Sequence, residues 1–277
     1  MATCHDSGVP RLSSTLLTVC LAAVLALAAY VDVLLVAAAV VVVQLLVATA
    51  SAPADARGRS IPSPRFTAAV VSGLVATGIT LAPTVLNGAD GSRSAADVTI
   101  ASGTLAALLP AIAAGVFVTL AAQMRRRDGR RELVASTGYA VSLGAFAALA
   151  VGWIGAAQSS GGADLVGVAA AGLAVGVLVW ALPVSRWLRG AMAVLLGTGA
   201  GSAVAFQLEA VVATSLGAAA GGAAAFFGIL GQAIGRAWSQ DRPHAAAGWG
   251  FPAGMSVALV GPVVYVGGQL VGAHHLF

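Results

Sequence analysis

The chain has 277 residues, of which 59% are hydrophobic and only 9% are charged. A soluble domain carries about 25% charged residues, so this composition excludes a water-soluble globular fold. All 14 basic residues are arginines, and the net charge is +4. The arginines are not interleaved with aromatic residues as in a nucleic-acid surface, so we expect no nucleic-acid partner.

The N-terminal part predicts a short tail followed by a helical hairpin. Residues 1–11 form the expected tail, and residues 12–50 are a nearly unbroken apolar run. As one helix this run would be about 58 Å long, roughly twice the hydrocarbon thickness of a bilayer. Tyr30 and Asp32 form the polar break in the run, so we expect two spans that turn there. The apolar run is too long for a cleaved signal peptide.

Polar, proline-rich or arginine-rich segments separate the later apolar segments. The linker 52–65 holds three prolines and three arginines, and residues 124–133 (MRRRDGRREL) are the densest charge run in the chain. Residues 236–249 are expected to form a polar loop, and Pro110 a kink inside its span. We therefore expect an all-α protein with one transmembrane domain at 12–273 and an external tail at 274–277. The nine expected spans cover residues 12–30, 33–51, 66–86, 98–123, 134–156, 164–182, 190–207, 211–235 and 250–273.

The arginines predict the orientation of these spans. With nine spans, 13 of the 14 arginines fall on one side of the membrane and only Arg93 on the other. Positively charged loops stay in the cytosol, so we expect the N-terminus inside and the C-terminus outside, in the cytoplasmic membrane of the cell. Trp180, Trp187, Trp238 and Trp249 also fall near the expected inner boundary.

Polar and small residues within the spans have structural and functional interpretations. Gln44 and Gln232 are expected to form interhelical hydrogen bonds, with substrate contact as the alternative. Asp32 is expected to be solvated in its turn, with a proton or cation path as the alternative. Glycine pairs at four-residue spacing indicate close packing of spans 6 to 8, although a chain with 35 glycines also produces such pairs by chance. The pairs are Gly172/Gly176, Gly197/Gly201, Gly217/Gly221 and Gly231/Gly235.

Arginines are the main polar side chains of the expected inner face. Charge-assisted hydrogen bonds from such a face could hold anionic lipid headgroups. The candidate headgroup-binding residues are Ser185, Arg186, Arg189, Gln232, Arg236, Arg242 and His244. No metal-ligand spacing and no catalytic motif is present in the sequence, so we expect no catalytic residue, no metal site and no cofactor.

Several short elements resemble those of a known family. They are Arg57–Pro62 (RGRSIP), Arg130–Tyr139, Pro183–Trp187, Gly231–Gln232, Ser256 and Gly261–Tyr265 (GPVVY). Over most of its length the chain resembles the bacterial phosphatidate cytidylyltransferases (CDP-diacylglycerol synthases). That resemblance implies a polytopic membrane enzyme that joins CTP to phosphatidic acid with magnesium. The composition also resembles that of integral membrane proteins of actinobacteria.

The departures from the family concern the residues that its chemistry needs. Val184 and Ser185 replace the family's lysines, and Pro252 and Met255 stand where its two signature aspartates are. Nucleotidyl transfer needs carboxylates that hold magnesium against the phosphates. We therefore expect a non-catalytic membrane protein that binds anionic phospholipid or a partner in envelope lipid metabolism. The alternatives are a residual cytidylyltransferase that uses magnesium and a small-solute transporter, for which matching broken spans would be expected.

Overall fold

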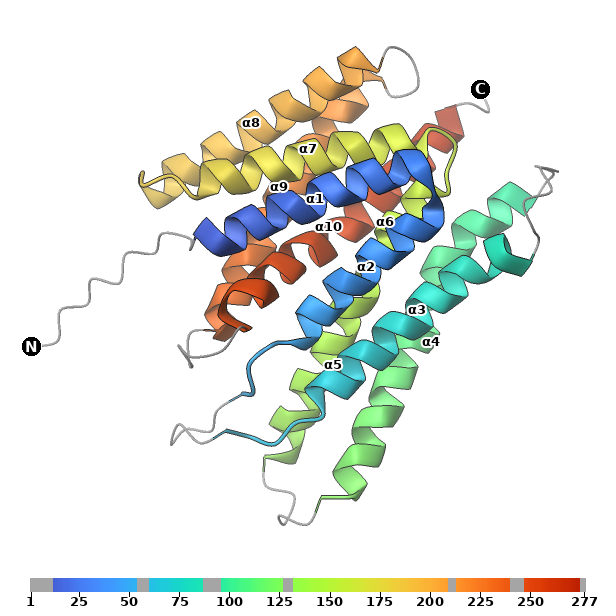
Figure 1. The fold of residues 1–277 in the computed structure, drawn as a ribbon, viewed down its shortest axis with the longest axis vertical. Coiled ribbons are helices and arrows are strands. Elements are labelled where there is room, and N and C mark those ends of the chain that lie inside the picture. Colours follow the sequence, from blue (N-terminus) through green and yellow to red (C-terminus); the bar gives the residue numbers. More distant parts are fainter. Residues whose placement is uncertain are drawn as a thin grey trace, which may run out of the picture.

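The structure is a computed structural model that describes residues 12–53, 60–86, 96–126, 132–208, 213–239 and 247–274. The described chain is all-helical (Figure 1). Its helices are α1 (Leu12–Val31), α2 (Val33–Ala48), α3 (Arg65–Leu86), α4 (Ala96–Met124), α5 (Leu133–Leu149), α6 (Gly152–Ala157), α7 (Gly162–Trp180), α8 (Arg186–Gln207), α9 (Thr214–Ser239) and α10 (Ala247–His274).

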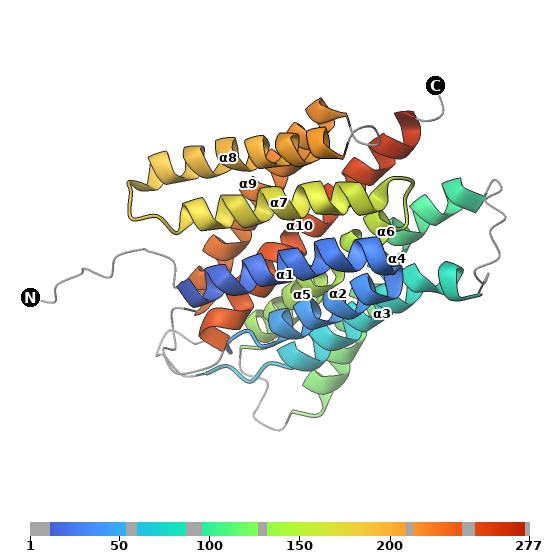
Figure 2. The same cartoon turned by 45° about the horizontal axis from the view of Figure 1, so that its top comes forward.

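The helices form a bundle of antiparallel passes, as Figures 1 and 2 show. Eight helical segments are long and apolar enough to cross a membrane, with α5 and α6 counted together as one. The chain is a multi-pass membrane protein, as the composition predicts. Helices suit this environment because all their backbone hydrogen bonds are made within the segment.

Helix α2 is shorter than expected. Its 16 residues extend about 24 Å at 1.5 Å per residue, which is less than the roughly 30 Å hydrocarbon core. The expected span 33–51 is therefore longer than the helix that forms, and α2 is not among the eight segments long enough to cross. The hairpin itself is confirmed, because the Asp32 carboxylate accepts a hydrogen bond from the Leu34 backbone N–H at 2.8 Å and caps α2. Asp32 is exposed in this turn, as expected.

The expected continuous span 134–156 is interrupted between α5 and α6. The Val151 N–H donates to the Ala148 carbonyl and the Trp153 N–H to the Ala150 carbonyl, a three-residue spacing that tightens the helix locally. A Cβ at Gly152 would lie 2.2 Å from the Gly261 carbonyl oxygen of α10. This backbone contact with α10 is a tertiary feature that apolar periodicity does not reveal.

Two helix ends also differ from the sequence-based expectation. Helix α8 begins at Arg186 rather than at residue 190, and α9 continues to Ser239 rather than ending at 235. The expected polar loop 236–249 is therefore shorter, because both of its ends are helical. Arg186, Arg189 and Arg236 consequently belong to helices, which gives their side chains defined positions.

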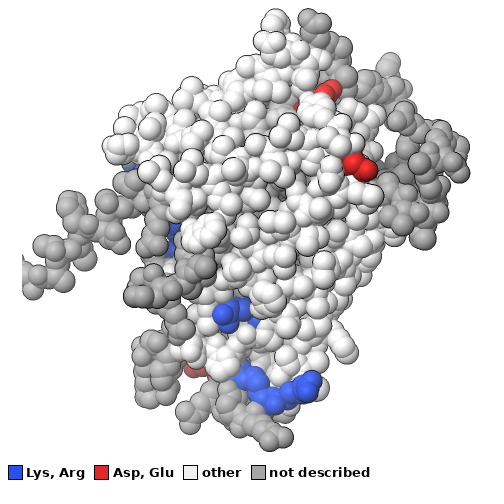
Figure 3. Space-filling view, viewed as in Figure 1, with Lys and Arg blue, Asp and Glu red and all other residues white. Residues whose placement is uncertain are grey.

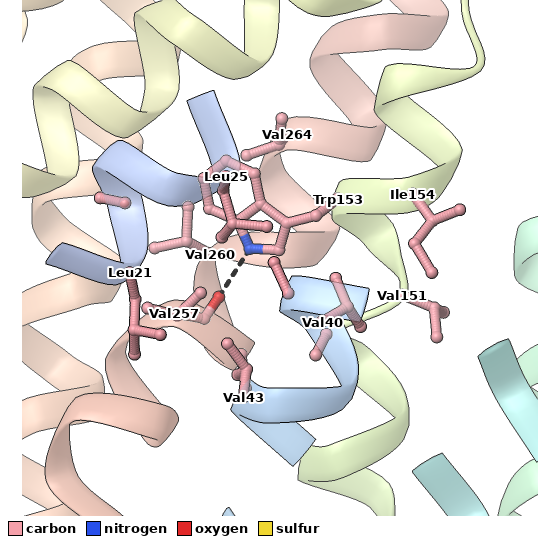
Figure 4. Close-up of a cluster of buried hydrophobic side chains, with 14 of the residues drawn as sticks. Leu21, Leu25, Val40, Val43, Val151, Trp153, Ile154, Val257, Val260 and Val264 are labelled. Atoms are coloured by element: carbon pink, nitrogen blue, oxygen red, sulfur yellow. Dashed lines mark hydrogen bonds between the residues drawn. The ribbon is translucent and has the colours of Figure 1, made fainter. Parts of the chain in front are cut away.

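The centre of the bundle is built around Trp153 of α6. This indole is fully buried, and Figure 4 shows it among Leu25 of α1, Val40 of α2 and Val260 of α10. Its Nε1–H donates to the Val257 carbonyl of α10 at 2.9 Å. Through Trp153 the short α6 therefore joins α1, α2 and α10 at the centre of the bundle.

Helices α7, α8 and α9 pack with almost no side-chain volume between them. A Cβ at Gly172 of α7 would lie 2.4 Å from the Gly221 Cα of α9, and one at Gly201 of α8 would lie 2.3 Å from the Gly217 carbonyl oxygen. The packing role expected for these glycine pairs is confirmed. The pair Gly231/Gly235 instead faces Met255 and Pro252 of α10.

We expect Gly172→Ala to destabilise the protein by about 1–3 kcal/mol, because the added methyl group overpacks a backbone contact. Thermal unfolding in detergent micelles measures the effect. Gly199→Ala on α8 is the matched control, since a Cβ there meets nothing within 4 Å. Equal unfolding temperatures for the two variants would contradict the packing that the structure shows.

Candidate anion-binding site at the basic end of the bundle

The described arginine side chains lie at the end of the bundle where α1 begins. Arg65 starts α3, Arg125 and Arg126 follow α4, Arg186 and Arg189 lie in the first turn of α8, and Arg236 lies in the last turn of α9. Asp32 and Asp164 lie at the opposite end, before α2 and in the first turn of α7. Figure 3 shows basic side chains along the left and lower margins and acidic ones at the upper right, with one acidic side chain at the lower left. Glu132, directly before α5, is a described acid at the same end as the arginines. We call this the basic end.

Arg189 is the most buried of these arginines. It is 6% exposed, and its guanidinium carbon lies 4.3 Å from the ring centroid of Trp180 at the end of α7. Its Nη1 also donates to the Leu182 carbonyl at 3.4 Å. Stacking on an indole is favourable for a guanidinium that has lost much of its hydration, so the α7–α8 turn holds this cation inside the helix ends.

Arg236 is held by a hydrogen-bonded chain that crosses from α9 to α1. Its Nη2 donates to the Gln232 Oε1 one turn earlier. The Gln232 Nε2 donates in turn to the Thr18 Oγ1 of α1 at 3.1 Å. Gln232 and Thr18 are fully buried. The expected interhelical hydrogen bond of Gln232 is confirmed, and both ends of its amide are occupied by protein groups.

Three arginine side chains of like charge lie at this corner. Arg186 and Arg189 belong to the first turn of α8 and Arg236 to the last turn of α9, and α8 packs against α9. Like charges that are partly removed from water weaken the fold unless a counter-charge is near. An anion at this corner would therefore relieve both the desolvation and the mutual repulsion.

Two of the other candidate residues, Ser185 and Arg186, lie at this corner. Ser185 immediately precedes α8 without capping it through its side chain, and Ser185 and Arg186 are both exposed. Trp187, with 89% of its surface exposed, extends from the same turn toward the lipid. Arg242 and His244 lie outside the described residues.

The sequence analysis did not identify the polar face of α1 at this corner. Ser14, Thr15 and Thr18 are all buried, and the Thr18 hydroxyl also donates to the Ser14 carbonyl at 2.9 Å. Hydroxyl residues spaced by three and four positions near the start of an apolar helix share one side of it. That spacing is the sequence pattern from which the polar face of α1 could have been predicted.

A second arginine group at the basic end has a structural role. The Arg126 Nη1 donates to the Gln123 Oε1 at 2.7 Å, and the Gln123 Nε2 donates to the Ser136 Oγ at 2.7 Å. The Ser136 hydroxyl donates to the Pro62 carbonyl at 2.8 Å. These bonds join α4 and α5 to the segment before α3. Arg126 is thus committed to the fold, in contrast to the exposed Arg125 and Arg186.

Gln44 forms the expected interhelical hydrogen bond on the far side of the core. Its Nε2 donates to the Thr77 Oγ1 of α3 at 3.0 Å. It also fills the space beside Gly73, where a Cβ would lie 2.8 Å from the Gln44 Cδ. Gln44 is therefore a packing residue of the α2–α3 contact.

The elements that carry the family resemblance pack against one another in part. A Cβ at Gly231 would lie 2.6 Å from the Ser256 Cα, and the Ser256 hydroxyl donates to the Gly228 carbonyl. Pro252 and Met255 are buried against α9. Within the described part of the chain, no group of three His, Cys, Asp or Glu residues could hold a metal ion. Searches of family models, curated proteins and solved structures find no match to this chain.

We expect Gln232→Leu to destabilise the protein more than Gln44→Leu. The first change removes the acceptor of the half-buried Arg236 guanidinium, worth about 1.5–3 kcal/mol, whereas the second removes one neutral interhelical bond, worth about 1 kcal/mol. Unfolding of both variants in the same micelles checks the order. A larger loss in Gln44→Leu would contradict the role assigned to Gln232.

Proposed function

We propose that this protein is a non-catalytic membrane protein whose basic end faces the cytosol and binds anionic phospholipid. The observation that carries the proposal is the group formed by Arg186, Arg189 and Arg236, which lie at the ends of two helices that pack against each other. Headgroup phosphates lie at the same depth as the ends of membrane-spanning helices. Arginine is suited to them because its fork of donors matches phosphate oxygens.

The orientation belongs to the same proposal. Cytosolic retention of arginine-rich segments places the basic end inside, where the leaflet surface is negative because of its anionic lipids. We propose the cytoplasmic membrane of a bacterium as the location. A protein partner in envelope lipid metabolism would dock on the same face, since Arg125 and Arg186 are exposed there.

The two alternatives remain competing proposals. In the first, the chain is a degenerate relative of the phosphatidate cytidylyltransferases that keeps residual activity with magnesium. Formation of CDP-diacylglycerol from CTP, magnesium and phosphatidic acid by purified protein would establish it. In the second, the interruption between α5 and α6 and the prolines Pro252 and Pro262 inside α10 form the broken helices of a transporter. Uptake by proteoliposomes would establish that alternative.

We expect the purified protein to retain phosphatidylglycerol in preference to phosphatidylcholine. The variant R186Q/R189Q/R236Q should lose most of this preference, because three donors of charge-assisted hydrogen bonds are removed. Native mass spectrometry of protein released from mixed micelles measures the bound lipid.

R125Q is the control for a lost surface charge at the same end, because Arg125 is exposed and lies next to α4. A wild-type protein without preference for anionic lipid would refute the proposal. An equal loss of preference in R125Q would show that overall charge, and not the α8–α9 corner, is responsible.

The orientation can be tested across α7, whose two ends lie on opposite sides of the membrane. In a background with both native cysteines replaced by serine, we expect a membrane-impermeant maleimide to label Ser160→Cys in intact cells and Val184→Cys only after lysis. Both positions are exposed. The reverse pattern would contradict a cytosolic basic end.

A further inference from the structure

We propose that the basic ends of α1, α7 and α9 form a recessed site for the phosphate of a phospholipid headgroup that carries no cation, with Thr15, Trp180 and Arg236 as its donors. The inference deepens the proposed function and rests on it, since it specifies where the anionic lipid is bound and which headgroups are selected. Besides the arginines, the site includes the Thr15 hydroxyl of α1 and the indole N–H of Trp180.

The primary observation is a set of buried donors without acceptors. The Thr15 Oγ1, the Trp180 Nε1 and the Arg236 Nε are all inaccessible to solvent and have no hydrogen-bond partner among the described residues. Thr15 is fully buried, and only 8% of Trp180 is exposed. An unsatisfied buried polar group costs about 1–3 kcal/mol. Three such donors at one end of the bundle therefore indicate a bound group that accepts their hydrogen bonds.

The chemistry of the three donors defines which group can accept their hydrogen bonds. The indole N–H and the guanidinium N–H groups can only donate, and a hydroxyl can do so as well. The missing partner therefore presents acceptor oxygens. Because Arg189 and Arg236 place positive charge beside it, a negatively charged oxygen is favoured over a neutral carbonyl.

The bond between Thr18 and Gln232 sets Thr15 and Arg236 at the same depth. Helices α1 and α9 are the first and eighth passes of the bundle, so they run in opposite directions. Thr15 lies three residues before Thr18 and Arg236 four residues after Gln232. Both are thus about one turn, roughly 5 Å, closer to the basic end than the Thr18–Gln232 bond.

Trp180 is linked to this pair through Arg189. The Arg189 guanidinium stacks on the Trp180 ring, and its helix α8 packs against α9, whose last turn holds Arg236. Helix α7 packs directly against both α1 and α9, and it ends at Trp180. The three donors thus come from helices that surround one corner, with Arg189 of α8 at its margin.

The surroundings favour a lipid as the source of the phosphate. Trp187 and Leu188 in the first turn of α8 are exposed, and such apolar side chains at a helix end contact lipid acyl chains and the interface. A headgroup bearing an amine or choline would place a second cation beside Arg186 and Arg189. The site should therefore select phosphatidylglycerol-type headgroups over phosphatidylcholine.

The test uses Thr15→Val and Trp180→Phe, which keep the shape of each side chain and remove one donor. Titration of the full-length protein with dioleoylphosphatidylglycerol, followed by native mass spectrometry, should show affinity about tenfold weaker or more for each variant, as expected for one hydrogen bond to a charged group. Affinity for dioleoylphosphatidylcholine should not change.

Each variant has a matched control. Thr119→Val removes a hydroxyl that is equally buried but bonds the Gly115 carbonyl of its own helix, and Trp249→Phe removes the indole N–H of an exposed tryptophan near the start of α10. Both should bind phosphatidylglycerol like the wild type. Thr15→Ser keeps the hydroxyl and should retain affinity, which separates loss of the donor from a folding defect.

The outcomes distinguish this inference from the proposed function. If the wild type does not prefer phosphatidylglycerol, the proposed function fails, and this inference fails with it. If the wild type prefers phosphatidylglycerol and Thr15→Val and Trp180→Phe bind it equally well, the recessed site is refuted while the proposed function stands. Competition by glycerol 3-phosphate that depends on Thr15 and Trp180 would support the site and assign it to a soluble phosphate ester.

Discussion

The close approach of α7, α8 and α9 is the contact on which the basic corner depends. Backbone atoms of Gly172, Gly201 and Gly221 meet where any side chain would collide, so α8 lies directly on its two neighbours. In lipid, such packing replaces the hydrophobic driving force available in water. The first turn of α8 then places Arg189 on Trp180, at the same end of the bundle as Arg236. A wider spacing would leave these cations apart and hydrated.

The bundle satisfies its internal polar groups in two different ways. The side chains of Gln44 and Trp153 donate to acceptors on neighbouring helices, and the Ser136 hydroxyl donates to the segment before α3, so these bonds join separate parts of the bundle. At the α1–α7–α9 corner, Gln232 is satisfied but Thr15, Trp180 and the Arg236 Nε are not, within the described chain. The Ser72 and Thr137 hydroxyls are also buried without a partner among the described residues. Polar groups inside a membrane protein usually pair with each other, and the α1–α7–α9 corner adds an indole N–H and a guanidinium N–H, which we propose as donors to a bound phosphate.

The same contrast separates the two arginine groups at the basic end. Arg65 and Arg126 donate to the Ala50 carbonyl and to Gln123, and they hold the segment before α3 in place. Arg186 is exposed, while Arg189 and Arg236 are drawn into the helix ends. Positive charge in the loops alone explains orientation. It does not explain why guanidinium groups should leave water, which is why lipid binding is proposed at the α8–α9 corner.

Composition and arginine spacing by themselves determined the membrane fold, the approximate span limits and the common end of the arginines, because apolar length and charge act locally along the chain. The glutamine bonds and the glycine packing of α7–α9 were also predictable, since such residues have few other uses inside lipid. Only the tertiary structure decided the interruption at Ala150–Val151, the contact between Gly231 and α10, and the role of Thr15 and Thr18. These features depend on which residues of distant helices meet at the same depth, and a linear pattern does not contain that information.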